Sequence, residues 1–194
     1  MPPKSKYSKE QLIDVAFAIA CKEGFDSITI RKVAEQLGSS IAPIYVNFKD
    51  VGELKHEVVL KTISLTKEII AEQNSGDSFL DVGIGSVIFA KNYPLLFEEL
   101  VLKSNNAFKE QSETNEYVFN RLKENSELMQ FDDDKLKLLL IKMQALQAGL
   151  SLMARKEQYS NILSDELILK ILDDTGRDVI DGMIKRNEGG KSVL

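Results

Sequence analysis

The chain has 194 residues, of which 43% are hydrophobic and 28% are charged, and its net charge at pH 7 is −5. These proportions are typical of an ordinary soluble globular protein, with enough residues for one large domain or two small ones. A membrane span is not expected, because no uninterrupted apolar run reaches the roughly 18 residues that a bilayer requires.

The cytoplasm is the expected location. The first ten residues, MPPKSKYSKE, are basic and polar and lack the apolar core of a secretory signal. Cys21 is the only cysteine and cannot form an internal disulfide, which agrees with a reducing compartment. It lies in an alanine-rich run, where a buried, inert thiol is expected.

The charge is unevenly distributed along the chain. Residues 1–60 hold eight of the 25 basic and eight of the 30 acidic residues, which leaves 17 and 22 for the remainder. Before the first acid, Glu10, the chain carries Lys4, Lys6 and Lys9. This asymmetry favours a nucleic-acid-binding N-terminal end and an acidic body.

A first helix is predicted from about Ser8 to Glu23. Ser8 and Gln11 match the capping box, in which each side chain accepts the other residue's backbone N–H. Gly24 ends the helix, and one face carries a buried stripe formed by Leu12, Val15, Ala16, Ile19 and Ala20.

The stretch from Thr29 to Phe48 predicts two short helices joined by a tight turn. Apolar residues recur at three-to-four-residue spacing on either side of Gly38, which can adopt the left-handed conformation that a helix end needs. Ser40 is the expected cap of the second helix. Two helices joined in this way are the helix-turn-helix signature of DNA-binding proteins. Spacing alone leaves open any helical hairpin in an all-α domain.

The middle of the chain predicts a long helix followed by shorter ones. A helix from Asp50 to about Gln73 is roughly 35 Å long and is expected to act as a strut between two domains. A loop follows at Asn74 to Asp77. Further helices are predicted over Ser78–Asn92, Pro94–Lys103 and Ala107–Gln130.

The last two predicted helices, 133–156 and 165–186, carry more apolar residues than one buried stripe needs. The excess favours a four-helix bundle formed with a second copy across a twofold axis. The alternative is a deeply buried pair within one monomer. The expected dimer interface comprises Ala145, Ala148, Gly149, Leu152, Ile168, Leu172, Val179 and Met183.

The sequence holds no recognisable catalytic or metal site. His56 is the only histidine, so neither a Ser-His-Asp triad nor a multi-histidine metal site can form within one chain. The segment Gly83-Ile84-Gly85 lacks the third glycine and the preceding strand of a dinucleotide site. We therefore expect no enzyme activity, no metal and no cofactor.

The first fifty-odd residues resemble the DNA-binding domain of TetR-type transcriptional regulators, the tetracycline-repressor family. The resemblance rests on LIDVAFAIACKEGF, SITIRKVAEQLGSS and IAPIYVNFKDVGEL, and it covers about a quarter to a third of the chain. The matching features are the Gly24–Phe25 pair, Thr29, Val33-Ala34, Gly38, Ile44-Tyr45, Phe48 and Leu54.

The resemblance implies an all-α fold with a three-helix helix-turn-helix DNA-binding domain at residues 1–49. A long connecting helix and a helical ligand-binding and dimerisation domain at residues 50–194 would complete it. It also implies a homodimer that binds a pseudo-palindromic double-stranded DNA operator, usually as a repressor released by a small ligand. A second reading is a small-molecule-binding helical protein whose DNA-binding domain is weak or non-functional. A helical interaction or enzyme module is a third, although no site supports it.

Matching positions imply DNA contacts at Thr29, Arg31, Ser39, Ser40, Ile41, Ala42, Pro43, Tyr45 and Asn47. Lys49 is expected to substitute for a lysine that the family often carries two residues later, and the basic tail adds Lys4, Lys6 and Lys9. Two positions depart from the family pattern: Ile41 and Val51 stand where basic residues are common. The recognition surface is therefore unusually apolar. We expect it to read DNA through contacts such as thymine methyl groups and to rely on the lysines of the N-terminal tail for phosphate contacts.

The ligand is expected to be small and apolar or uncharged. Seven side chains could line its cavity or could equally be plain core: Phe89, Tyr93, Phe97, Tyr117, Phe119, Met129 and Met143.

Overall fold

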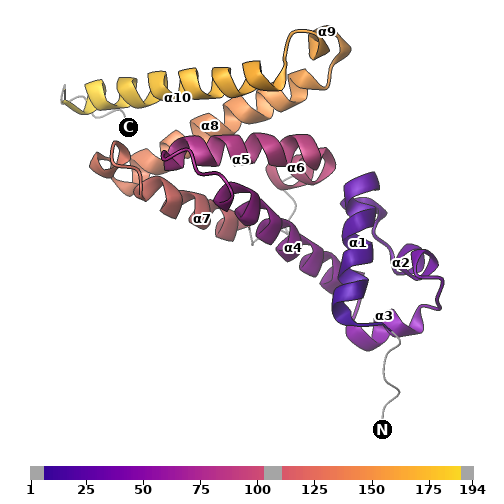
Figure 1. The fold of residues 1–194 in the computed structure, drawn as a ribbon. Coiled ribbons are helices and arrows are strands. Elements are labelled where there is room, and N and C mark those ends of the chain that lie inside the picture. Colours follow the sequence, from indigo (N-terminus) through magenta and orange to yellow (C-terminus); the bar gives the residue numbers. More distant parts are fainter. Residues whose placement is uncertain (1–6, 103–110, 189–194) are drawn as a thin grey trace. The chain divides into compact units, whose positions relative to one another are not determined.

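The computed structural model describes residues 7–102 and 111–188, and over these residues it is all-α with no strand, as the sequence predicts. Figure 1 follows the helices from indigo at the N-terminus to yellow at the C-terminus. In chain order they are α1 (Lys9–Glu23), the 3-10 helix η1 (Phe25–Ser27), α2 (Ile30–Gln36), α3 (Ala42–Asn47), α4 (Val51–Ala71), α5 (Ser78–Asn92), α6 (Pro94–Leu102), α7 (Gln111–Lys123), the 3-10 helix η2 (Leu128–Gln130), α8 (Asp133–Ala154), α9 (Glu157–Ser160) and α10 (Asp165–Glu188).

Internal contacts divide the chain into two compact units. Unit 1 comprises Met1–Glu68 and Asn92–Thr114, and unit 2 comprises Ile69–Lys91 and Asn115–Leu194. Helix α4 contributes its first part to unit 1 and its end to unit 2. These units are defined by which residues pack together. The predicted boundary between a DNA-binding domain at 1–49 and a ligand-binding domain at 50–194 remains a prediction.

Unit 1 is built around α1. The predicted capping box is present: the Ser8 hydroxyl accepts the Gln11 N–H at 3.2 Å, and the Gln11 side chain accepts the Ser8 N–H at 2.9 Å. Gly24 ends the helix with φ at +84°. Burial of part of the Cys21 side chain raises the pKa of its thiol, as expected for an inert cysteine.

Helix α6 also belongs to unit 1, where it packs against α1 and η1. The rings of Phe17 on α1 and Tyr93 just before α6 lie 6.2 Å apart between centroids. Buried apolar side chains from α1 to α4 and from α6 form the core of unit 1. Among them are Leu12, Ala16, Phe25, Ile28, Val33, Ile44, Phe48, Leu54, Val58 and Leu96.

Unit 2 contains α8 and α10, which pack against each other and are connected through α9 (Figure 1). Two apolar clusters fill the space around them. One is centred on Leu128, Leu136 and Leu139, and the other on Val87, Leu150 and Leu172. Met143 contacts both clusters and connects them.

Two local predictions were wrong. The predicted helix over residues 107–130 ends at Lys123, because the Asn125 side-chain oxygen accepts the N–H groups of Glu127 and Leu128 and starts η2 instead. Residues 107–110 of that prediction lie outside the described residues. Ser40 does not cap α3, since the cap position is Ile41 and no side chain bonds to the helix start there.

Helix α8 is the one helix of the described residues that is long and apolar enough, by length and composition, to cross a membrane. Only 17% of its apolar window is buried inside the monomer. Because Lys142 interrupts the apolar residues, the helix contains no uninterrupted apolar run of membrane-spanning length. The helix therefore presents an apolar surface that the single chain does not cover.

Two glycines of α5 provide a matched test of close helix packing in unit 2. A Cβ atom placed on Gly85 would lie 2.8 Å from the Cα atom of Ile70 on α4, whereas one placed on Gly83 would meet nothing within 4 Å. Gly85→Ala is expected to lower the free energy of unfolding by about 1–3 kcal/mol, because the α4 backbone must shift. Gly83→Ala is expected to raise it by about 1 kcal/mol through helix propensity. Urea denaturation of both variants measures the difference, and equal stabilities would show that α4 and α5 do not approach so closely.

Candidate nucleic-acid interface

Thr29 fixes the start of α2. Its hydroxyl accepts the backbone N–H of Lys32 at 3.1 Å, so it is the side-chain cap of this helix. Arg31 follows two residues later and is exposed to solvent. The Lys32 ammonium is paired with Glu23 of α1, which ties the start of α2 to the end of α1. Arg31 is thus the exposed basic side chain of this helix start.

The turn after α2 is a Schellman motif centred on Gly38. The Ser39 N–H donates to the carbonyl of Ala34 at 2.9 Å, and the Gly38 N–H donates to that of Glu35 at 3.0 Å. This pattern requires Gly38 to adopt a positive φ, and its φ is +59°. The reversal directs the chain into α3.

Helix α3 is held by one buried face and exposes the other. Ile44 and Phe48 are 0% and 1% exposed, and they fix the helix in the core of unit 1. On the outer face, Tyr45 is 54% exposed and Val46 is 62% exposed, and Ile41 just before the helix is 45% exposed. Large apolar side chains at such exposure mark a surface suited to a partner.

Val46 is the most exposed of these three side chains, but it is not among the DNA contacts predicted from the sequence. Its position in the helix could have predicted this exposure. Since successive residues are 100° apart around a helix, Val46 lies opposite the buried Ile44 and one turn after Ala42. The Asn47 amide nitrogen donates to the Pro43 carbonyl at 2.8 Å within the helix, so one of its N–H groups is already engaged. Because the sequence of α3, APIYVN, contains no charged residue, its outer face carries no charged side chain.

The remaining predicted contacts in this region surround the turn. Ser40 and Ala42 are exposed, Pro43 is half-buried, and the Ser39 hydroxyl donates to the Ser40 carbonyl at 2.9 Å. Lys49 is exposed after α3, and its backbone N–H donates to Glu53 at 2.7 Å. The structure places these residues along one continuous segment with α3.

The N-terminal lysines are partly outside the described residues. Lys4 and Lys6 belong to residues 1–6, which the structure does not describe. Lys9 is paired with Glu57 of α4 and lies 5.5 Å from the Phe48 ring centroid. The hydrogen bond to Glu57 raises the pKa of the Lys9 ammonium above its ordinary value. Lys9 thus fastens α1 to α4, a role that spacing did not predict.

Tyr7 positions the start of the described chain beside the turn. Its hydroxyl donates to the Leu37 carbonyl at 3.0 Å, at the end of α2. This hydrogen bond joins the residue before the α1 cap to the end of α2.

The aromatic and methionine residues predicted to line a ligand pocket fall in both units. Phe97 and Tyr93 belong to unit 1, and Phe89 is buried in unit 2. Phe119 and Met143 pack against apolar clusters, Tyr117 is half-buried, and Met129 is 69% exposed on η2. Their role in a ligand pocket therefore stays a prediction.

The predicted dimer residues separate by helix. On α8, Ala145, Gly149 and Leu152 are exposed and Ala148 is half-buried. On α10, Leu172 and Met183 are buried in the apolar clusters of the same monomer, and Ile168 and Val179 pack against those clusters. Leu172 and Met183 thus belong to the monomer's own core, where α10 packs against α8, and the dimer interface itself stays a prediction.

Comparisons with known proteins place this fold among solved structures. No protein-family profile and no curated protein matches the sequence. A proposed transcriptional regulator from Streptomyces coelicolor A3(2), SCO7518, has a TM-score of 0.59 at 16% identity over 84% of this chain and 95% of its own. A proposed transcriptional regulator from Pseudomonas aeruginosa PAO1 has a TM-score of 0.60 at 18% identity over 92% of each chain. A protein of unknown function from Rhodococcus sp. RHA1 has a TM-score of 0.64 at 16% identity over 94% of this chain and 98% of its own. At these identities the similarity establishes the fold.

Proposed function

We propose that this protein is a cytoplasmic transcriptional regulator of the TetR type. It binds a pseudo-palindromic DNA operator as a homodimer, represses the adjacent gene and is released by a small ligand. Its activity is binding, with no catalysis.

The observation that carries the proposal is the outer face of α3. A helix of six residues, preceded by a Schellman turn and fixed by two fully buried side chains, exposes Ile41, Tyr45 and Val46. A short helix that is anchored on one face and carries exposed apolar side chains on the other fits a major groove, where apolar side chains contact thymine methyl groups. Two of the three structural relatives described above are themselves proposed transcriptional regulators, which supports the same reading.

The surface of α8 supports the homodimer. Leu138, Ile141, Ala145, Ala148 and Leu152 follow a three-and-four spacing, which is the seam of two helices packed side by side. Ile141 is 61% exposed and Leu152 is 43% exposed in the monomer. Since α10 already covers the opposite side of α8, this seam is the surface available to a second copy.

Arg31 provides a test of base readout. If its guanidinium pairs with guanine, Arg31→Ala is expected to weaken operator binding by about 1–3 kcal/mol and to relax the preference at one base pair. Fluorescence anisotropy with a panel of single-base operator variants measures both effects. Arg31→Lys is the control, because it keeps the charge but cannot form the bidentate pair. Unchanged affinity and preference in Arg31→Ala would remove Arg31 from the interface.

The alternative is a ligand-binding helical protein whose DNA-binding domain is weak or non-functional. The lack of charge on the outer face of α3, together with the engagement of Lys9 by Glu57, favours it. A mobility-shift assay with the DNA upstream of the protein's own gene separates the two functions. A discrete, competitor-resistant complex supports the regulator, and salt-sensitive smearing without a discrete complex supports the alternative.

A further inference from the structure

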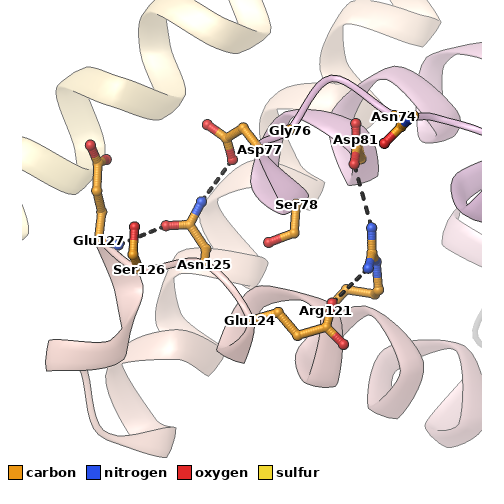
Figure 2. A pocket seen from close by; sticks show the side chains of 10 residues that line it. All are labelled: Asn74, Gly76, Asp77, Ser78, Asp81, Arg121, Glu124, Asn125, Ser126 and Glu127. Carbon is orange, nitrogen blue, oxygen red and sulfur yellow. Dashed lines mark hydrogen bonds and ion pairs between the residues drawn. The ribbon is translucent and has the colours of Figure 1, made fainter.

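A polar cavity of about 430 Å³ lies in unit 2, where the loop between α4 and α5 meets the end of α7 (Figure 2). This volume is in the range of sites for small molecules. None of the aromatic residues predicted to hold a ligand lines it. Its lining consists of Asn74, Gly76, Asp77, Ser78, Asp81, Arg121, Glu124, Asn125, Ser126 and Glu127.

The charge of the lining is negative. Four carboxylates face one guanidinium, and no aliphatic or aromatic side chain is among the ten lining residues. Arg121 is already engaged by two of the acids: its terminal nitrogens lie 3.4 Å from Asp81 and 2.6 Å from Glu124. Arg177 lies near the cavity, but its own guanidinium bonds to Asp173 at 3.1 Å. The hydrogen bond to Asp173 is the main cause that raises the pKa of Arg177, and Asp77 and Glu127 add to it. The cavity therefore carries more carboxylates than cationic side chains, even when the nearby Arg177 is counted with Arg121.

The inner carboxylates are held in place by their neighbours. Asp81 is only 4% exposed and accepts both the backbone N–H of Ser75, at 2.9 Å, and its hydroxyl, at 2.6 Å. Asp77 accepts the Asn125 amide at 2.7 Å and the N–H of Phe79 at 2.9 Å. Figure 2 shows the Asp77–Asn125 and Asp81–Arg121 pairs on opposite sides of Ser78. A site whose acceptors are fixed before binding loses little entropy on binding.

Two polar atoms at this cavity have no partner among the described residues. The Ser78 hydroxyl oxygen and the Arg121 Nε atom are buried without a hydrogen bond. Such buried, unsatisfied groups are uncommon, because each is unfavourable for folding. The Ser78 oxygen can accept a hydrogen bond from an N–H donor, whereas Arg121 Nε can only donate. A bound amine would therefore satisfy the Ser78 oxygen and leave Arg121 Nε as it is.

We propose that this cavity binds a small hydrophilic amine, whose ammonium groups donate to the carboxylates of Asp77, Glu124 and Glu127. The absence of aromatic side chains from the lining disfavours quaternary ammonium, which binds in aromatic cages, and favours primary or secondary amines with N–H donors. The proposal differs from the apolar or uncharged ligand that the aromatic residues predict. It concerns binding alone and does not rest on the DNA-binding function.

The test uses 1,4-diaminobutane as the probe and 1,4-butanediol as the matched compound, which has the same carbon chain without the charges. Isothermal titration calorimetry with the full chain in the absence of DNA is expected to show saturable binding of the diamine and none of the diol. The double variant Glu124→Gln/Glu127→Gln is expected to bind the diamine at least about tenfold more weakly. Both side chains are exposed, so the variant is expected to keep its fold, which circular dichroism checks.

The control variant, Asp134→Asn/Glu166→Gln, removes two carboxylates elsewhere in unit 2 and has the same net charge. It is expected to bind the diamine like the wild type. The proposal is overturned if the diamine shows no saturable binding up to about 10 mM, if the diol binds equally well, or if both double variants lose affinity alike. The last result would assign the attraction to the acidity of the whole chain.

Discussion

Val46→Glu is expected to abolish specific DNA binding and to leave the fold unchanged. Val46 is 62% exposed and lies opposite the buried face of α3, so the substitution disturbs little packing. Its effect on the free energy of unfolding is expected to stay within about 0.5 kcal/mol. In the proposed complex, however, the new carboxylate would enter a groove lined by phosphates and base edges. Repulsion and the loss of apolar contact are expected to reduce affinity at least about 100-fold.

Ile162→Glu is the matched control for this prediction. Ile162 is 59% exposed and lies between α9 and α10 in unit 2. The same change of residue type and charge at similar exposure separates a local effect at α3 from the general effect of one more negative charge. Fluorescence anisotropy at fixed salt compares the two variants with the wild type. Equal losses of affinity, or none, would contradict the placement of α3 in the groove.

Ile141→Glu is expected to convert the dimer into a monomer. Ile141 is 61% exposed in the single chain and is the second of the five residues of the α8 seam. Across a twofold axis each copy would bring its own carboxylate into an apolar interface, which leaves two uncompensated charges close together. Multi-angle light scattering during size-exclusion chromatography measures the mass directly.

Loss of the dimer should also weaken operator binding, because a monomer holds only one half-site. Ile162→Glu again serves as the control and should remain dimeric. A mass of twice 21.8 kDa for Ile141→Glu would exclude the α8 seam as the interface. A monomeric wild type would instead exclude the homodimer.

The features that the sequence predicted well depend on neighbouring residues. The Ser8–Gln11 capping box, the positive φ of Gly38 and the bounds of α5 follow from residues within one or two helical turns. The same holds for the start of α8 at Asp133, where the preceding Asp132 side chain accepts the Lys135 N–H at 2.9 Å. Local chemistry decides such features before any tertiary packing forms.

The features that it missed depend on residues far apart in the chain. The helix break after Lys123 is accompanied by the bond between Asn125 and Asp77, which are 48 residues apart. The pairing of Lys9 with Glu57 and the burial of Leu172 and Met183 likewise follow from how helices pack. The polar cavity draws its lining from two segments whose acidic residues look like ordinary solvated helix ends. Periodicity identifies apolar faces, but it does not identify the element that covers each one.

DNase I footprinting of the wild-type protein on the DNA upstream of its own gene tests the central claim most directly. The account predicts two protected half-sites of inverted sequence, one helical turn or a multiple of it apart, at a protein concentration where Ile162→Glu also protects and Val46→Glu does not. Uniform weak protection that disappears at moderate salt, identical for all three proteins, would contradict it.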